Sequence, residues 1–336
     1  MRDMSEATGI PLSTLHRHLK EGTIKRRSTR MKPLLTDKKM AERLEFCRSH
    51  VRPSGPHGSR IAASGAGEAG LAESAVFDDM WDVVHLDEKC FNADKNVRKV
   101  YHTEGEEPEQ RAWSSKLFIP KVMFLAAVSR PRHDDERGTN FDGKIGIWPI
   151  VEYLPAVCNS RNRPAGTIVP TLVNVDAAVY RDYVITRVIP VIKSMFPTSN
   201  ERVVLQHDNA TPHGGITTVN LACVSTDGWS FGVRCQPPNS PDLNVLYLGF
   251  FASIQSLQYK LVSRTLDDVI RATHAAFDLA GSEALAKVFL SLQAVMRLVL
   301  ENNGGNQFRL PHLRKNALKR AGALMTNVPC PSVLLE

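Results

Sequence analysis

Three features are missing from this sequence of 336 residues: long apolar runs, paired cysteines and an apolar N-terminal leader. No run of about 18 or more apolar residues occurs, so we expect no membrane-spanning helix. The opening residues, MRDMSEATGIPLS, lack the apolar stretch of a signal peptide, so we expect no secretion. The six cysteines form no CxxC pair, which argues against a zinc knuckle or a disulfide framework and for reduced thiols inside the cell. The composition, 43% hydrophobic and 23% charged, is typical of a soluble globular protein.

Positive charge is unevenly distributed along the chain. Residues 1–50 hold 12 Lys or Arg against six Asp or Glu, so this segment accounts for +6 of the net charge of +7. Clustered Lys and Arg neutralise phosphates, which favours a nucleic-acid-binding segment. The alternative is a basic arm that is only solvated and has no partner.

A short amphipathic helix is predicted over Leu12–Lys20. The sequence GIP at 9–11 makes a tight turn before it, and its three leucines share one face. The polar residues left for the major groove are Ser13, Thr14, His16, Arg17 and Lys20. This is the pattern of the second helix of a helix-turn-helix. Because the first helices of such a unit should precede Ser5, we expect the chain to begin inside a DNA-binding domain.

The sequence IKRRSTRMK at 24–32 follows this helix and is strongly basic. Its cations, suited to phosphates or a minor groove, are Lys25, Arg26, Arg27, Arg30 and Lys32. The same run resembles a weak nuclear-localisation signal, so we expect the protein in the nucleus. Thr36 is predicted to cap a helix that extends to about His50.

Residues 52–75 are rich in Gly, Ala, Ser and Pro, a composition typical of a flexible linker. They include GAGEAG at 65–70, which matches the dinucleotide-binding pattern GxGxxG. The pattern binds a dinucleotide only where it joins a strand to a helix, and no run of β-branched residues typical of a strand precedes residues 65–70. We therefore expect no nucleotide cofactor.

From Phe77 onward the hydrophobic pattern predicts an α/β domain. Strands are predicted at 81–87, 99–102, 121–129, 143–151, 202–208 and 231–237. Helices are predicted at 174–196, broken at Pro190, and at 244–260, 265–280 and 282–302. Thr265 and Asp268 resemble a capping box at the start of the third of these helices.

Two aspartates, Asp87 and Asp208, are each predicted to end an apolar strand. Adjacent parallel strands would bring both carboxylates to one edge of the sheet, where they could share divalent cations. A third acid is then expected on the helix that begins at Asn244. A rival hypothesis is a zinc hydrolase, although its ligands would point in different directions. Its candidate ligands are His85, Asp87, His207, Asp208 and His213.

Three motifs in this order carry a resemblance: LDEK at 86–89, QHDNATPH at 206–213 and QPPNSPDLN at 236–244. Together they resemble the DDE/D transposases of the Tc1/mariner superfamily, the mariner-like branch in particular. The resemblance implies an RNase H-like α/β catalytic domain, a mixed sheet with flanking helices, behind a partial all-α helix-turn-helix region. The domains it implies are a DNA-binding region at 1–50, a linker at 51–75, the catalytic domain at 76–262 and a C-terminal helical region at 263–336.

The resemblance also implies an activity and its requirements. The family cleaves and joins strands of double-stranded DNA at terminal inverted repeats, using two Mg²⁺ (or Mn²⁺) ions, and the resemblance allows a homodimer. Carried over by motif, the first two metal-binding acids are Asp87 and Asp208. The third acid follows SPDLN by three positions, and that position is Tyr247.

A phenol at position 247 departs from the family pattern. With a pKa near 10 it stays neutral at pH 7, so it cannot supply the charge that divalent cations require. Asp242, five residues earlier, is expected to cap the following helix and not to substitute. Cys90 stands where the family has a large aromatic residue. We therefore expect a transposase by descent that is catalytically impaired; the alternative is a DNA-binding protein without catalysis.

Overall fold

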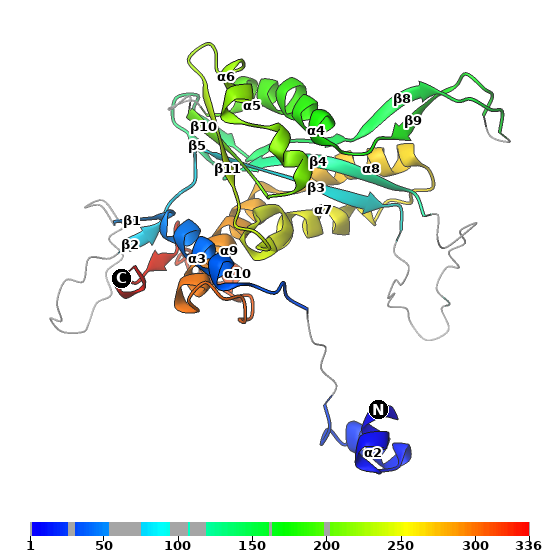
Figure 1. The fold of residues 1–336 in the computed structure, drawn as a ribbon, viewed down its shortest axis with the longest axis vertical. Coiled ribbons are helices and arrows are strands. Elements are labelled where there is room, and N and C mark those ends of the chain that lie inside the picture. The colour runs from blue at the N-terminus through cyan, green and yellow to red at the C-terminus, as the bar shows by residue number, and fades with distance from the viewer. Residues whose placement is uncertain are drawn as a thin grey trace. The chain divides into compact units, whose positions relative to one another are not determined.

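The computed structural model describes residues 2–25, 31–53, 75–94, 107, 119–160, 163–197 and 202–335 (Figure 1). The chain divides into two compact units, Met1–Leu34 and Leu35–Glu336. This boundary differs from the predicted one after residue 50, because helix α3 (Asp37–Arg48) packs into the core of the larger unit through Phe46 and Cys47. Within the described ranges, no helix is long and apolar enough to cross a membrane.

A five-stranded mixed sheet forms the centre of the larger unit, in the order β11-β10-β3-β4-β7. Its strands are β3 (Val83–Asn92), β4 (Lys121–Ser129), β7 (Lys144–Pro149), β10 (Arg202–His207) and β11 (Ser230–Cys235). Strand β10 is parallel to both β3 and β11, whereas β4 is antiparallel to β3 and to β7. Strands β4 and β10 are buried over nearly their whole length, as expected when both faces of a sheet are covered.

Helices cover both faces of this sheet (Figure 1). The elements on one face are α4 (Ala177–Tyr183), the π-helical η1 (Val184–Val188), α5 (Ile189–Met195) and α6 (Thr218–Ala222). Those on the other face are the π-helical η4 (Leu246–Phe250), α7 (Phe251–Gln258), α8 (Leu266–Leu279) and α9 (Ser282–Glu301). Residues of β3 alternate between the two cores, with Val83 in one and Val84 in the other. The predicted mixed sheet with flanking helices is confirmed.

Local signals placed several of these helices correctly. The Thr265 hydroxyl accepts a hydrogen bond from the Asp268 amide at 3.1 Å, and the Asp268 carboxylate accepts one from the Thr265 amide at 3.0 Å, which is the predicted capping box. Thr36 caps α3, as predicted. Near the kink or break predicted at Pro190, the helix contains a π-helical turn, η1, which ends at Val188, and Pro190 lies in the first turn of α5, where its missing N–H is tolerated. The predicted strand at 99–102 lies outside the described residues.

Shorter elements complete the larger unit. A three-stranded sheet contains β1 (Val51–Pro53), β2 (Ala75–Phe77) and β12 (Pro329–Cys330). Two hairpins pair β5 (Arg132–Asp134) with β6 (Thr139–Phe141) and β8 (Val151–Pro155) with β9 (Ile168–Leu172). The remaining helical turns are η2 (Thr211–Gly215), η3 (Pro241–Leu243), α10 (Lys315–Arg320) and η5 (Ser332–Leu334). The two ends of the predicted 51–75 linker are thus strands that pair with each other, and residues 54–74 lie outside the described ones.

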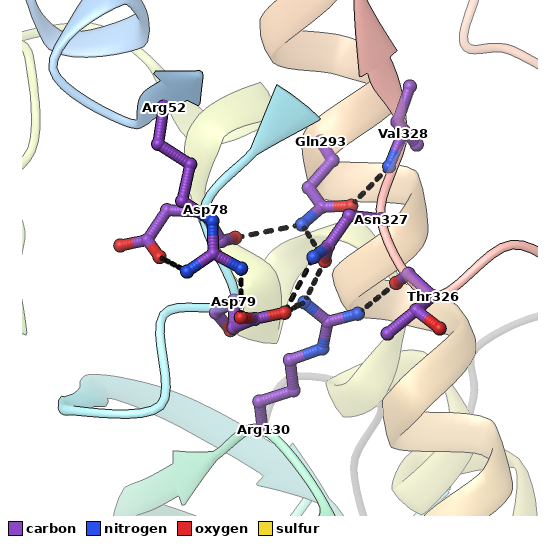
Figure 2. A network of polar contacts seen from close by, with 8 residues as sticks. All are labelled: Arg52, Asp78, Asp79, Arg130, Gln293, Thr326, Asn327 and Val328. Carbon is purple, nitrogen blue, oxygen red and sulfur yellow. Dashed lines mark hydrogen bonds and ion pairs between the residues drawn. The ribbon is translucent and has the colours of Figure 1, made fainter. Parts of the chain in front are cut away.

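A network of polar contacts holds the C-terminal segment against this small sheet and α9 (Figure 2). Arg130, at the end of β4, donates to the Asn327 side chain at 2.6 Å and to the Thr326 carbonyl. The Gln293 side chain, on α9, donates to the Asn327 side chain and accepts from the Val328 amide, both at 2.9 Å. The segment at 326–328 is therefore fixed by groups from two other elements.

The same network reaches the β1–β2 pair through two aspartates. Arg52, on β1, forms ion pairs with Asp78, at 3.4 Å, and with Asp79. The Asn327 side chain donates to the Asp79 carboxylate at 2.6 Å. Since Arg130 also lies 3.8 Å from Asp79, two cations share this carboxylate.

The smaller unit contains two helices, α1 (Arg2–Thr8) and α2 (Leu12–Lys20), joined at Gly9. Helix α2 has the predicted bounds, and the φ of +69° at Gly9 explains the glycine in the turn. One helix, α1, precedes α2 and contains Ser5. Leu15 is the buried residue of α2, whereas Leu12 is exposed.

Candidate active site

Asp87 and Asp208 lie on neighbouring parallel strands. The register between β3 and β10 pairs His85 with Gln206, and two further residues along each strand place Asp87 level with Asp208. Asp208 directly follows β10, as predicted. Asp87 does not end its strand as predicted: β3 continues to Asn92, because its pairing with β4 persists after its pairing with β10 stops.

The Asp87 carboxylate is buried, with 4% of the residue exposed. One of its oxygens accepts from the Glu88 amide at 2.7 Å, and the other accepts from the Asn244 side chain. Burial, followed by the charges of Glu88 and Asp208, raises the pKa of Asp87 to about 7, against the opposite effect of these hydrogen bonds. A carboxylate of this kind has a strong tendency to bind a proton or another cation.

His213 connects the other two acids of the cluster. Its Nδ1 lies 2.7 Å from an Asp208 oxygen and its Nε2 lies 3.0 Å from a Glu88 oxygen. Burial disfavours the imidazolium, but these hydrogen bonds outweigh burial and raise the pKa of His213 to about 10. The hydrogen bond from His213 in turn lowers the pKa of Asp208. One imidazolium thus neutralises part of an acidic cluster formed by Asp87, Glu88 and Asp208.

The SPDLN turn brings Asn244 to this cluster. The Asn244 side chain donates to Asp87 through its nitrogen and accepts through its oxygen from the Leu246 amide, at 2.9 Å, and the Tyr247 amide, at 3.3 Å. It is 2% exposed. One side chain therefore caps the following helix and holds the first aspartate, which fixes the position of residue 247 relative to Asp87.

Tyr247 lies at the predicted third-acid position and is 52% exposed. Its ring packs edge-on against Phe251, with centroids 5.6 Å apart, and the Lys89 ammonium lies 5.9 Å from the ring centroid. Burial and the charges of Asp87, Asp208 and Glu88 raise the pKa of the Tyr247 phenol. The phenol is therefore neutral at pH 7 and lies within the electrostatic field of both aspartates.

Asp242 has a different role from the predicted helix cap. Its two oxygens accept from the Arg43 guanidinium at 2.8 and 2.7 Å, and Arg43 also donates to the Gly304 carbonyl at 2.8 Å. The Arg43 side chain is fully buried. Asp242 therefore ties the SPDLN turn to α3 and cannot serve as a spare metal ligand.

The donor set does not fit the two-metal site that the resemblance implies. Divalent hard cations need several oxygen ligands, and the site offers the Asp87 and Asp208 carboxylates with a neutral phenol in the third position. The remaining carboxylate of the cluster, Glu88, is ion-paired with His213. Among the described residues, no three or more His, Cys, Asp or Glu side chains are arranged to hold a metal ion. The candidate ligands of the zinc-hydrolase hypothesis do not converge on one point either. His85 packs against Phe289 in the core on one face of the sheet, whereas His207 stacks on Tyr180 in the core on the other face.

The predicted DNA-contacting side chains are mostly at the surface of the smaller unit. The exposed ones are Ser13, His16, Arg17, Lys20, Lys25 and Lys32. Thr14 is half-buried, and Arg26, Arg27 and Arg30 lie outside the described residues.

Sequence reasoning did not find the contacts made by Glu88, His213 and Asn244. All three residues lie in the quoted motifs, so the motifs could have identified them as candidate site residues. A motif does not show, however, which of its side chains contact side chains from another motif. Arg43 lies in no motif, and only the fold brings it to the site.

Comparison with protein-family models finds no match, and comparison with curated proteins finds none. Solved structures are similar to this chain. The pre-cleavage Mos1 transpososome aligns with a TM-score of 0.57 and 17% identity, over 92% of this chain and 75% of that one. The Mos1 mariner paired end complex with Mn gives 0.56 and 17% over the same shares, and the Mos1 Strand Transfer Complex gives 0.54 and 16%, over 91% and 74%. The chain therefore has the RNase H-like fold of the Mos1 transposase, which confirms the mariner resemblance at the level of the fold.

Proposed function

We propose that this chain is a mariner-like transposase by descent that binds double-stranded DNA at terminal inverted repeats and is impaired in cutting and joining it. The fold, the level register of Asp87 and Asp208 and the three motifs support the descent. The observation that carries the impairment is at the SPDLN turn: Asn244 fixes the helix start against Asp87, and the residue presented there is Tyr247. The alternative, a DNA-binding protein without catalysis, shares this incomplete site.

Two cations lie beside the carboxylates of the site. The single charge of the His213 imidazolium offsets part of the charge of Asp208 and Glu88, and the Lys89 ammonium lies 5.9 Å from the Tyr247 ring centroid. A bound divalent cation would supply charge neutralisation and activation of the attacking oxygen. With two carboxylates in place of three, the chain cannot hold and orient a pair of such ions.

DNA partners follow from the same proposal. The Mos1 neighbours include a paired-end complex with the left transposon end. In the present chain, the exposed cations of α2 and Lys25 are the groups that would contact DNA. The basic run at 24–32 supports a nuclear location as part of the same proposal. A homodimer is also proposed. Hairpin β8–β9 extends beyond the sheet (Figure 1). It exposes Tyr153 and Ile168 on one face and Leu154 on the other, apolar side chains suited to contact with a second copy.

Replacing Tyr247 with Asp should raise Mg²⁺ affinity by about tenfold or more, because the affinity of oxygen-ligand sites rises steeply with the number of anionic ligands. Calorimetric titration of Mg²⁺ and Mn²⁺ measures this directly. The matched control is Tyr247→Phe, which removes the hydroxyl and adds no charge. Asp208→Ala in the Tyr247→Asp background should abolish the gain.

Nicking of a terminal-repeat duplex is the second readout for this site. The unmodified chain should show little or no Mg²⁺-dependent nicking. The impairment is refuted if the unmodified chain binds metal as tightly as the Tyr247→Asp variant and nicks DNA in a way that depends on Asp208.

Duplex DNA binding should fall steeply with salt. If five phosphates are neutralised by the N-terminal region, that region contributes a slope of roughly −4 to −5 to a plot of log K against log salt. Replacing Arg17, Lys20 and Lys25 with Gln should flatten the slope by roughly 2 to 3, measured by fluorescence anisotropy. The control replaces Arg181, Arg202 and Lys260, three exposed cations of the larger unit, with Gln. Equal losses in both variants would mean that binding follows net charge and not the N-terminal unit.

A further inference from the structure

A second basic segment lies near the C-terminus, far from the N-terminal cations in sequence. Residues 302–335 contain five Lys or Arg, one His and no Asp or Glu. We call residues 308–325, which hold all of these cations, the basic strap.

The basic strap is fastened at both ends. Just before it, the Gly304 carbonyl accepts from buried Arg43, and Gly304 has a φ of +81°. A Cβ at Gly304 would lie 2.2 Å from the Met40 carbonyl oxygen, so the chain runs tightly against α3 here. Just after the strap, residues 326–328 are held by Arg130 and Gln293 (Figure 2).

Apolar side chains and one lysine also anchor the strap along its length. The residues that pack onto the main core are Phe308, Leu313, Leu324 and Met325. The Lys315 ammonium donates to the Lys287 carbonyl and the Ser291 hydroxyl, both on α9. The backbone that carries the cations is therefore positioned before any partner binds.

The remaining cations of the strap face solvent. They are Arg309, His312, Arg314, Lys319 and Arg320. Lys319 forms an ion pair with Glu283 at 2.6 Å; within the part of the chain that the structure describes, no carboxylate pairs with Arg309, Arg314 or Arg320. Arg314 has a left-handed backbone, with φ of +46°, and lies between the anchored Leu313 and Lys315. A residue other than glycine is strained in this region, so the anchors on both sides hold Arg314 in place.

We propose that the basic strap binds the sugar–phosphate backbone of duplex DNA, as a second DNA surface on the larger unit. The proposal rests on the proposed function, because DNA is the polyanion that a transposase handles. Arg309, Arg314 and Arg320, which pair with no carboxylate among the described residues, lie on a backbone that is already held in place. They give a dense positive surface at little ordering cost, as phosphate contacts require. Phosphate contacts carry no sequence information, so we expect binding by the strap to be independent of DNA sequence.

The test uses the full chain with Arg309, Arg314, Lys319 and Arg320 replaced by Gln. Binding to a duplex of arbitrary sequence is measured by anisotropy between 0.05 and 0.2 M salt. If each cation neutralises one phosphate, the slope of log K against log salt should flatten by roughly 3 to 4. The matched control replaces Arg181, Arg202, Lys260 and Arg264, which are exposed and change the net charge equally. Circular dichroism and thermal unfolding of both variants establish that each is folded.

The outcomes separate this proposal from the proposed function. If the unmodified chain binds no duplex DNA, the proposed function fails and the strap proposal fails with it. If the chain binds DNA and the strap variant keeps the slope of the control, the strap proposal alone is wrong. A strap variant that loses binding to vesicles containing phosphatidylserine and keeps its DNA slope would also overturn it, in favour of a lipid surface.

Discussion

Replacing Asp242 with Ala should lower the free energy of unfolding of the larger unit by about 3–5 kcal/mol. The change leaves the Arg43 guanidinium, whose side chain is fully buried, with the Gly304 carbonyl as its remaining partner. Breaking a buried ion pair from one side has this cost because the other charge stays out of water without compensation. Urea denaturation followed by tryptophan fluorescence measures it, since all four tryptophans of the chain, the first of them Trp81, come after residue 34.

The reverse substitution should be milder. Arg43→Met leaves the Asp242 carboxylate, whose side chain is 19% exposed and can be hydrated, and it fills the arginine's place with an apolar side chain. The double variant should be more stable than the sum of the two single changes indicates. Additive single effects, or a larger cost for Arg43→Met, would contradict an ion pair that couples α3 to the SPDLN turn.

This ion pair illustrates what the sequence could not predict. Asp242 is a good helix-cap residue by local rules, and a cap is what the sequence predicted. Its partner lies 199 residues away, and nothing in the pattern around Arg43 distinguishes it from the exposed cations of α3. Asn244 could take over the capping because its side chain both donates and accepts, which left the carboxylate of Asp242 available for Arg43.

Periodicity and motif order predicted much of the fold and the core of the site. The apolar strands before Asp87 and Asp208 indicated that both acids would reach one region of the sheet, and the β3–β10 register places them level. The end of β3 was missed because a strand's length depends on its neighbours: β4 continues the pairing where β10 stops. Helix α3 belongs to the larger unit for a similar reason, since its burial depends on packing against distant parts of the chain.

Acid should destabilise the larger unit, and His50 should be one cause. Its Nδ1–H donates to the Phe46 carbonyl at 2.7 Å, so its Nε2 is the acceptor for the Arg234 guanidinium at 2.9 Å. Protonation of Nε2 would replace that hydrogen bond with a contact between two cations. Burial first, and the charge of Arg234, lower the pKa of His50. His85 contributes in the same direction, since burial lowers its pKa to about 3.

The sign of the effect follows from proton counting. Below pH about 6.5 the unfolded chain protonates these histidines and the folded chain does not, so the unfolded state binds more protons and stability falls as the pH falls. Each such histidine contributes at most about 1.4 kcal/mol per pH unit until the pH reaches its folded pKa. Asp87 opposes them between about pH 7 and its ordinary range, because its raised pKa lets the folded state bind the extra proton.

Replacing His50 with Gln should therefore flatten the fall in stability between pH 6.5 and 5 by about 1 kcal/mol per pH unit, whatever it does to stability at pH 7. Glutamine can donate to the Phe46 carbonyl and accept from Arg234, but it does not titrate. Urea denaturation at intervals of half a pH unit measures the slope. The matched control is His312→Gln, which removes one imidazole from an exposed position. If both variants change the slope alike, the effect comes from the loss of an imidazole and not from its burial against Arg234. If His50→Gln keeps the slope of the unmodified chain, then His50 can be protonated in the folded chain without losing its contact with Arg234. That result would refute the inference that His50 must be neutral to accept a hydrogen bond from Arg234.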